Sequence, residues 1–179
     1  MNFIDTPFEG LIILEPKIFH DDRGYFFESF NKADFEKHNI PFTFVQDNQS
    51  LSNKGVLRGL HFQNPPYEQG KLIRVIKGSV LDVVVDIRKS SPTFGKHFSL
   101  ELNDRSHHIL WIPPGFAHGF LALEDETIFL YKCTNFYNKD AESGIRFNDP
   151  DLDIDWREKK PVLSGKDIQL QSWKEFIAH

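Results

Sequence analysis

The sequence lacks the features that mark several classes of protein. A single cysteine, Cys133, excludes a disulfide within the chain, and we expect a protein of the reducing cytoplasm. No apolar run approaches the roughly 18 residues that predict a transmembrane helix. Lys and Arg total 21 against 26 for Asp and Glu, a net charge of -5, whereas nucleic-acid-binding proteins usually carry a basic surplus. We therefore expect neither a membrane nor a nucleic acid as a partner.

Alanine, the strongest helix former, is scarce, whereas phenylalanine occurs 18 times. Aromatic residues favour strands, so this composition favours a β-rich fold. The hydrophobic fraction of 40% excludes a disordered chain, and 179 residues suit one domain of ordinary size. We expect residues 1–179 to form that single domain.

Turn residues punctuate short apolar runs along the chain. The clearest strand covers 80–88, where Leu81, Val83 and Val85 alternate with residues that include Asp82, so one face is apolar and the other mixed. Further strands are predicted at 11–14, 24–30, 55–63, 71–77, 97–102, 107–112, 118–123 and 126–136. About nine strands predict an all-β barrel or double-sheet jelly roll, because these architectures leave few exposed strand edges.

Two helices are predicted outside the strands. Asn31 has the character of an N-cap for a helix that runs to about His38 and ends before Pro41. A serine followed three residues later by an acid has the spacing of a capping box, which predicts a second helix over 164–177. The polar segment 137–163 is expected to be mostly loop.

His61 lies in an apolar predicted strand, with Arg58 three residues before it and Lys71 at the start of the next strand. A lone histidine in such a strand is more often a hydrogen-bonded core residue than a catalytic one. Strict alternation would put Arg58 and His61 on opposite faces, whereas a bulge at Gly59 would bring them to one side. The sequence permits either arrangement.

Residues 113–118 read P-P-G-F-A-H, which matches the second half of the cupin pattern, P-x-G-x-x-H, at the entry to a strand. In metal-binding cupins the first half supplies two histidines, but Gln63 stands in place of the second, and an amide oxygen is a poor ligand for a transition metal. No G-x-G-x-x-G segment opens a helix after a strand, so a dinucleotide has no signature. We expect no metal and no other cofactor, with the chemistry carried by side chains.

Three further residues have two interpretations each. Tyr131 and Tyr137 would usually be core or rim residues with satisfied hydroxyl groups. Asp167 would complete the capping box, or it would orient a histidine and stabilise its imidazolium form. Both roles of Asp167 hold together only if the start of that helix faces the site.

Taken together, ordered segments over nearly the whole chain resemble the dTDP-4-dehydrorhamnose 3,5-epimerase family of cupin enzymes. The longer matching segments read D-R-G-Y-F-F-E-S-F at 22–30, Q-D-N-Q-S at 46–50, G-V-L-R-G-L-H-F-Q at 55–63, P-P-G-F-A-H-G-F at 113–120, G-I-R-F-N-D-P at 144–150 and L-S-G-K-D at 163–167. Two shorter matches are Gly70 with Lys71 and Tyr131 with Lys132. Each segment is weak alone, but the full ordered set is specific. The resemblance implies a cupin-type jelly-roll barrel without a cofactor, which converts dTDP-4-dehydro-6-deoxy-D-glucose to dTDP-4-dehydro-L-rhamnose in dTDP-L-rhamnose biosynthesis.

The resemblance also implies a role for each catalytic residue. His61 would be the general base with Asp167 as its carboxylate partner, Tyr131 would be the general acid, and Lys71 would stabilise the enolate. These residue types suit the roles, because a histidine with a pKa of about 6.5 is largely neutral at pH 7 while a tyrosine at about 10 stays protonated.

A set of substrate-binding residues follows from the same resemblance. It comprises Arg23, Glu28, Gln46, Asp47, Asn48, Arg58, Lys71, His118, Tyr137, Glu142 and Lys166. Arg23, Arg58 and Lys166 would meet the diphosphate or nearby sugar oxygens, residues 46–48 would contact the nucleotide, and Tyr137 would stack on the thymine. His118 and Glu142 would complete the ligand shell.

Assembly is the last property that the resemblance implies. In the family, N-terminal strands cross to a partner subunit, so we expect a homodimer in which Arg23 and Glu28 serve the neighbour's site. An N-terminal segment rich in strands would otherwise leave an exposed edge.

Three other functions stay open. An epimerase acting at C3 or C5 alone, on a related dTDP-4-keto-6-deoxy sugar, would use the same residues, because a small tilt of Tyr131 could decide how many carbons react. A non-catalytic cupin that binds a sugar nucleotide would not need His61, Tyr131, Lys71 and Asp167 together. A metal-dependent cupin oxygenase would be revealed by its sensitivity to chelators.

Overall fold

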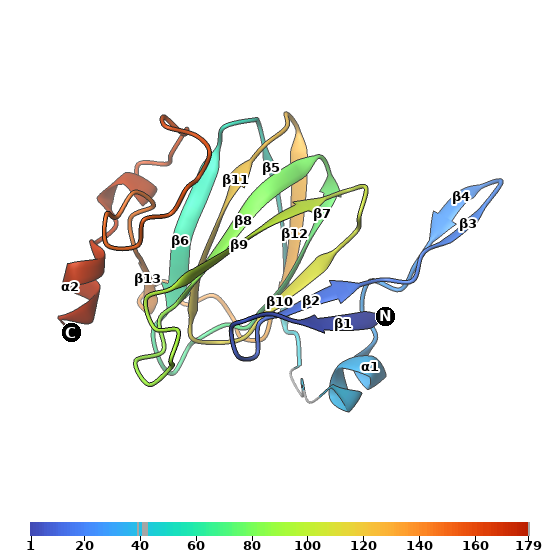
Figure 1. Ribbon diagram of the computed structural model, residues 1–179, viewed down its shortest axis with the longest axis horizontal. Coiled ribbons are helices and arrows are strands. Elements are labelled where there is room, and N and C mark those ends of the chain that lie inside the picture. Colours follow the sequence, from blue (N-terminus) through green and yellow to red (C-terminus); the bar gives the residue numbers. More distant parts are fainter. Residues whose placement is uncertain (39, 41–42, 179) are drawn as a thin grey trace.

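Two antiparallel sheets face each other in the computed structural model, which describes residues 1–38, 40 and 43–178 (Figure 1). In the first sheet the strand order is β1 (Asn2–Asp5), β2 (Ile12–Glu15), β10 (Ile109–Ile112), β7 (Lys71–Lys77), β12 (Thr127–Cys133) and β5 (Gln46–Ser52). In the second sheet it is β13 (Glu142–Gly144), β6 (Leu57–Gln63), β11 (Phe116–Ala122), β8 (Ser79–Asp86) and β9 (His97–Asn103). The prediction of an all-β jelly roll is confirmed.

Each predicted strand corresponds to an observed one, although β4 (Gly24–Phe26) is shorter than the predicted 24–30. Four strands were not predicted, namely β1, β3 (Phe19–Asp21), β5 and β13. The sequence of β5, Q-D-N-Q-S-L-S, carries no aliphatic alternation, yet all seven residues pair with β12. Backbone hydrogen bonds to a neighbour place this polar strand, and no local sequence pattern reports them.

The central strand β8 is buried on both faces. Val80 and Val84 belong to the core between the two sheets, while Leu81 belongs to an outer core that includes Trp173 of the C-terminal segment. The backbone of that segment runs beside β6 (Figure 1). Because side chains alternate along a strand, Asp82 shares the inward face with Val80 and Val84. The mixed face predicted from the sequence therefore points into the barrel instead of toward solvent.

The N-terminal helix prediction is confirmed. Helix α1 (Lys32–Lys37) begins after Asn31, whose side-chain oxygen accepts a hydrogen bond from the backbone N–H of Ala33 at 3.1 Å. Pro41, which was expected to follow the helix, lies outside the described residues. Within the described part of the chain, no helix is long and apolar enough to cross a membrane.

The prediction of one helix over 164–177 is wrong. The structure has a short 3₁₀ turn, η1 (Asp167–Gln169), and a separate helix, α2 (Trp173–Ile177), with its own capping box at its start. Between them Leu170 is extended, and Gln171 forms a β-bridge with Ile145. Pairing with the sheet thus interrupts a segment whose local pattern favours a helix.

A bulge in β6 brings two predicted site residues to one side of the strand. His61 pairs with His118, but Arg58 pairs with Phe120, so three steps along β6 match two along β11. Gly59 lies at this shift with a φ of 128°, and a Cβ atom there would meet the β11 backbone at 2.5 Å. Only glycine fits so close an approach. The bulge that the sequence permitted is confirmed.

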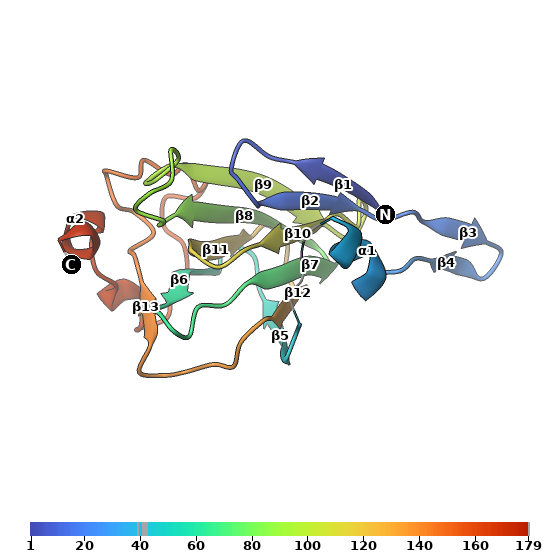
Figure 2. The same cartoon turned by 90° about the horizontal axis from the view of Figure 1, so that it is seen from below.

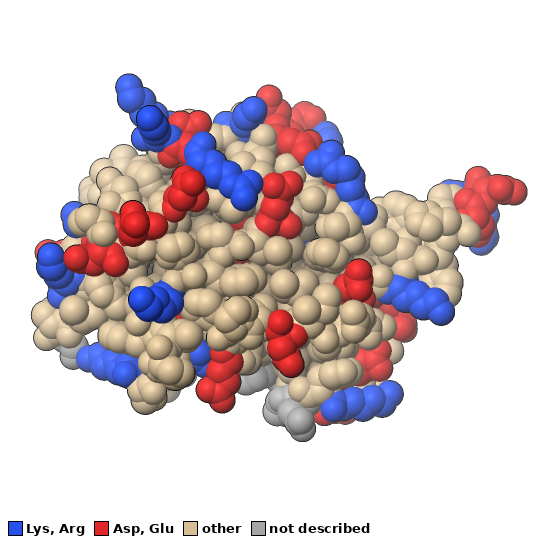
Figure 3. Space-filling model, in the orientation of Figure 1, with Lys and Arg blue, Asp and Glu red and all other residues tan. Residues whose placement is uncertain are grey.

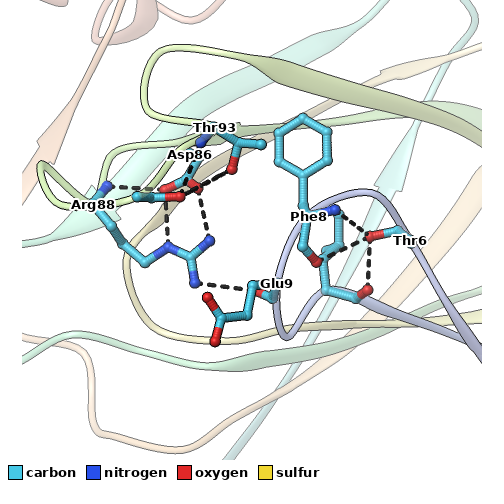
Figure 4. Close-up of polar contacts among 8 residues, drawn as sticks. Thr6, Phe8, Glu9, Asp86, Arg88 and Thr93 are labelled. Atoms are coloured by element: carbon cyan, nitrogen blue, oxygen red, sulfur yellow. Dashed lines mark hydrogen bonds and ion pairs between the residues drawn. The ribbon is translucent and has the colours of Figure 1, made fainter.

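Asp86, at the end of β8, binds several residues of the turn that follows this strand (Figure 4). Its buried carboxylate accepts hydrogen bonds from Arg88, Ser91 and Thr93 at 2.6–3.0 Å. Arg88 also donates to the backbone carbonyl of Glu9, which ties the N-terminal loop to this turn. Burial acts to raise the pKa of Asp86, but the hydrogen bonds outweigh it and lower this pKa from 3.8 to about 2.

Asp86→Asn is expected to lower the free energy of unfolding by about 2–3 kcal/mol, because the amide loses the charge that Arg88 pairs with. Since the folded pKa is depressed, the contribution of Asp86 is complete above pH 3.8 and is lost as the pH falls toward 2. Urea unfolding at pH 7 and pH 3 checks both statements. Glu126→Gln, which breaks only the exposed pair with Lys77, serves as the control and should not move the midpoint. Equal midpoints for the Asp86 variant and wild type would contradict the prediction.

Strands β3 and β4 form a hairpin that projects from the body of the protein and pairs only with itself (Figures 1 and 2). Phe19, Tyr25 and Phe26 are 53%, 56% and 66% exposed. In the space-filling view the projection carries charged side chains mainly at its tip (Figure 3). A two-stranded hairpin is marginally stable alone, and clustered exposed aromatic residues mark an interaction surface.

Candidate active site

Two adjoining cavities, of about 340 and 290 Å³, lie between the sheets. Both are lined by Asn48, His61, Lys71, Tyr131 and Glu142. The lining of the larger cavity further includes Arg58, His118, Phe120, Phe129, Ser164, Lys166 and Asp167, and that of the smaller one includes Gln46, Gln63, Gln69 and Tyr137. Strands of both sheets and the C-terminal segment thus build one site.

His61 and Asp167 form a hydrogen-bonded pair in the larger cavity. His61 Nε2 lies 2.5 Å from Asp167 Oδ1, and the other carboxylate oxygen accepts a hydrogen bond from the Ser164 hydroxyl at 2.7 Å. Burial acts to raise the pKa of Asp167, but the hydrogen bonds from His61 and Ser164 outweigh it and leave this pKa below 3.8. Asp167 is therefore ionised near pH 7 and holds the His61 ring through this hydrogen bond.

The capping-box interpretation of Asp167 is met only in part, because the 3₁₀ turn has Lys166 at its N-cap with no side-chain cap hydrogen bond. The backbone N–H of Asp167 donates to the Ser164 hydroxyl at 3.1 Å, as in a capping box, while its carboxylate reaches His61. The 3₁₀ turn that starts at Asp167 faces the cavity, so one residue shapes the local backbone and orients the histidine.

Lys71 brings a cation to the centre of the site. Among the described residues, none forms a hydrogen bond or ion pair with its ammonium group. Burial lowers the pKa of Lys71 below 10.5, while the nearby Cys133, Asp82 and Glu142 act in the opposite direction. An ammonium without a partner, next to a cavity, is available to a developing negative charge in a ligand.

Tyr131 lies on the neighbouring strand, β12, in partly apolar surroundings. Phe129 packs against its ring at 6.1 Å between centroids, and Phe129 in turn stacks on Phe120 at 4.2 Å. Burial raises the pKa of Tyr131 above 10, so its hydroxyl keeps its proton at neutral pH. The group is a proton donor within the same cavity as His61.

A second histidine–carboxylate pair lies beneath the cavity. His118 Nε2 is 2.8 Å from Asp82 Oδ2, and both residues are buried. The other oxygen, Asp82 Oδ1, has no hydrogen-bond partner among the described residues. Burial lowers the pKa of His118 although Asp82 opposes this, so the ring is neutral near pH 7.

At the mouth of the site, Glu142 holds two cavity residues together. Its Oε2 atom accepts a hydrogen bond from the Tyr137 hydroxyl at 2.6 Å and another from the Lys166 ammonium group. The hydrogen bond to Lys166 contributes to a raised pKa of that lysine and so keeps it cationic. A cation and an exposed aromatic ring thus lie side by side where a large anionic ligand could enter.

Three predicted site residues do not line either cavity. Arg23, in the turn of the projecting hairpin, pairs with Asp21 at 2.5 Å, and Glu28 accepts a hydrogen bond from Asn31. Asp47 lies on the opposite face of β5 from the cavity and pairs with Lys132 at 3.0 Å. The structure brings together all the other predicted site residues.

Sequence reasoning gave no role at the site to Asp82 and considered Ser164 only as a helix cap. Neither residue lies in a motif that would have indicated its role. The role of each is visible only in the structure, where Ser164 donates a hydrogen bond to Asp167 and Asp82 pairs with His118. Gln63 was considered only as a replaced metal ligand. Within the described residues, no group of three or more His, Cys, Asp or Glu side chains is arranged to hold a metal ion.

Known proteins share both the sequence and the arrangement. Residues 5–175 match the family model described as dTDP-4-dehydrorhamnose 3,5-epimerase. The curated dTDP-4-dehydrorhamnose 3,5-epimerase of Shigella flexneri is 53% identical over 174 residues, which are 97% of this chain and 96% of that protein.

Two solved structures superpose on nearly the whole chain. A dTDP-6-deoxy-D-glucose-3,5-epimerase of Legionella pneumophila, in complex with dTDP-4-keto-L-rhamnose, has a TM-score of 0.92 and 47% identity and covers 96% of this chain and 92% of its own. A variant of a 3'-monoepimerase of Streptomyces bikiniensis, in complex with dTDP, has a TM-score of 0.93 but 30% identity, over 98% of this chain and 89% of its own.

Proposed function

The chain belongs to the dTDP-4-dehydrorhamnose 3,5-epimerase family, and from this premise we propose that it epimerises dTDP-4-dehydro-6-deoxy-D-glucose at C3 and C5. The product is dTDP-4-dehydro-L-rhamnose, an intermediate of dTDP-L-rhamnose biosynthesis. The observation that carries the proposal is the His61–Asp167 pair in one cavity with Lys71 and Tyr131. We further propose that residues 1–179 act as a single cupin-like domain.

The first step needs a base. Protons on C3 and C5 are acidic because both carbons are adjacent to the C4 ketone. In our proposal His61 accepts such a proton, and the C–H electron pair moves into a C=C bond while the ketone oxygen becomes an enolate. The carboxylate of Asp167, 2.5 Å from the ring, stabilises the imidazolium that forms.

The enolate oxygen needs a positive partner. Lys71 fits this role because its ammonium group, in a partly desolvated cavity, makes no competing ion pair among the described residues. An electrostatic interaction that grows as the charge develops lowers the barrier to proton removal.

Inversion needs an acid on the opposite face of the sugar ring. We assign this role to Tyr131, whose raised pKa preserves the phenolic proton until the carbon takes it up. The enolate then returns to the ketone, and solvent exchange restores the proton on Tyr131 and removes the one on His61. One such cycle occurs at each epimerised carbon.

The remaining cavity residues are proposed to bind the substrate. Arg58 and Lys166 carry charges that suit the diphosphate or sugar oxygens, and Tyr137 offers an exposed ring to the thymine. Amide and imidazole groups for the nucleotide and sugar come from Gln46, Asn48 and His118.

Incubation of the purified protein with dTDP-4-dehydro-6-deoxy-D-glucose in D2O tests the proposed function. NMR of the sugar should show deuterium at C3 and C5 together with the L-rhamno product. A protein that leaves both positions protonated is not this epimerase.

A monoepimerase is the second candidate, because the 3'-monoepimerase of Streptomyces bikiniensis shares the fold at a TM-score of 0.93. The higher identity to the 3,5-epimerases, 47–53% against 30%, favours reaction at both carbons. Deuterium at one carbon only, with inversion there, would identify the second candidate.

The charge of Lys71 is expected to set the alkaline side of the pH profile. Burial lowers the pKa of Lys71 from its usual 10.5, so its ammonium group loses its proton at a lower pH than an exposed lysine would, whereas burial moves the pKa of Tyr131 upward from 10. We expect kcat/KM to begin falling below pH 10.5. Lys71→Arg, whose guanidinium stays charged, should move this fall to higher pH even if the absolute rate drops. An unchanged alkaline limb in the variant would contradict the assignment.

We also propose a homodimer in which the projecting hairpin reaches the neighbour's site. Arg23 and Glu28 do not line the cavities of their own chain, and Phe19, Tyr25 and Phe26 remain more than half exposed. A second copy would cover these rings and add a cation to each cavity.

Mixing two inactive variants tests this assembly. If Arg23 serves the neighbour's site, Arg23→Ala and His61→Ala homodimers are each impaired, but their heterodimer has one site with both residues intact. Unfolding and refolding an equal mixture should then restore about a quarter of the wild-type activity, as expected for random pairing in a two-fold dimer. No recovery, or sedimentation of an active 20.9 kDa monomer, would refute the composite site.

A further inference from the structure

Three glutamine side chains hold the backbone of residues 135–138, the loop that carries Tyr137. Gln69 donates to the carbonyl of Asn135 at 2.8 Å, and Gln63 donates to the carbonyl of Phe136 at 3.2 Å. The N–H of Tyr137 donates to Gln46 at 3.0 Å, and the N–H of Asn138 donates to Gln63 at 2.7 Å. Every residue of the loop therefore has a backbone group bound to a glutamine amide.

Gln63 is the most engaged of the three. It is 7% exposed, and its NH₂ group donates to Phe136 and also to the carbonyl of Tyr67 at 2.5 Å, while its oxygen accepts from Asn138. A glutamine amide has two N–H donors, so both are used. The side chain thus bridges two loops, one on each side of it.

Apolar packing contributes little to the position of this loop. Phe136 and Tyr137 are 65% and 52% exposed, so neither ring anchors the segment in a core. A loop without buried side chains is ordered mainly by its hydrogen bonds, and loops of this kind open readily when those bonds are lost. Glu142 holds the Tyr137 hydroxyl at 2.6 Å, while the glutamine contacts, two of them from Gln63, hold the backbone that carries the ring.

We propose that Gln63 is a positioning residue that fixes the 135–138 loop and thereby presents Tyr137 to the base of the bound nucleotide. This inference rests on the proposed function and deepens it, because it assigns part of the nucleotide affinity to a residue that need not touch the ligand. If the loop is already ordered before binding, the conformational entropy lost in ordering it does not reduce the affinity for the ligand. Gln63 stands in the sequence where metal-binding cupins have a histidine ligand, and here its amide holds two loops by hydrogen bonds.

Titration of the 179-residue protein with dTDP by calorimetry tests the proposal. Gln63→Met keeps the length and approximate volume of the side chain and removes all three hydrogen bonds. If the loop is then correctly placed for only about a tenth of the time, the apparent Kd for dTDP rises about tenfold. Gln171→Met, which removes one amide contact to Ser143 outside the loop, is the matched control and should bind as wild type.

A double-mutant cycle with Tyr137→Ala separates positioning from general destabilisation. If Gln63 acts through Tyr137, then Gln63→Met should cause little further loss of dTDP affinity once the Tyr137 ring is absent. A tenfold loss that persists in the Tyr137→Ala background overturns the proposal, and so does wild-type affinity in the single Gln63 variant. Tyr137→Ala that binds dTDP as wild type overturns it as well.

Hydrogen exchange provides a measurement that needs no Gln63 variant. The backbone N–H groups of Tyr137 and Asn138 should exchange slowly in the wild-type protein, because each donates to a glutamine oxygen. Exchange as fast as in an unstructured peptide would overturn the proposal. Failure of the proposed function would look different: wild-type protein would leave the sugar unlabelled in D2O whatever the behaviour of this loop.

Discussion

Replacing His61 with alanine is expected to lower kcat by at least about 10²–10⁴-fold, the usual contribution of a general base. His61 lines the cavity and is hydrogen-bonded to the ionised Asp167. The other cavity histidine, His118, is buried and hydrogen-bonded to Asp82. Among the described residues, these two are the histidines that line the cavities, so His61 is the one placed to accept the proton. Deuterium exchange at C3 and C5 should fall together with turnover, because both begin with the same abstraction.

The measurement compares steady-state rates, exchange rates and thermal midpoints of the purified variants. His97→Ala removes a histidine that bonds the Leu152 carbonyl outside the cavities, so its activity should be close to wild type. Asp167→Asn should reduce the rate less completely than His61→Ala, since the base remains. If it alters only the thermal midpoint, Asp167 serves the local backbone alone. Wild-type turnover by a folded His61→Ala protein would exclude His61 as the base.

Tyr131→Phe is expected to separate exchange from inversion. Phenylalanine keeps the ring that packs against Phe129 but removes the proton that inversion requires, so the fold should tolerate the change. His61 can still remove the substrate proton and return a solvent-derived one to the same face. Inversion should fall by about 10²–10⁴-fold while deuterium continues to enter the sugar.

NMR in D2O, with label and configuration followed separately at C3 and C5, provides the test. Tyr67→Phe is the matched control, because this change also removes a phenolic hydroxyl but at a residue that does not line the cavities. A parallel decline of exchange and inversion would show that Tyr131 does more than donate a proton. Inversion at the wild-type rate would assign the donor to another group or to water.

The sequence alone predicted most of the residues that line the cavities, through a family resemblance that their types and their order along the chain carry. His61, Lys71, Tyr131 and Asp167 lie in segments whose order is specific even though each segment is weak. The aliphatic alternation of strands such as β8 was equally readable, since burial of one face imposes a period of two. Those local signals predicted the jelly roll and all but four of its described strands.

Only the tertiary structure decided how these residues are arranged. His61 and Asp167 are 106 positions apart, and the bulge that brings Arg58 beside His61 appears only in the pairing of β6 with β11. Pairing with β12 also makes 46–52 a strand and places Asp47 on the face away from the cavity. Pairing of Gln171 with Ile145 divides the predicted helix over 164–177. Strand register and long-range hydrogen bonds depend on residues that are distant in the chain, so a local sequence pattern cannot predict them.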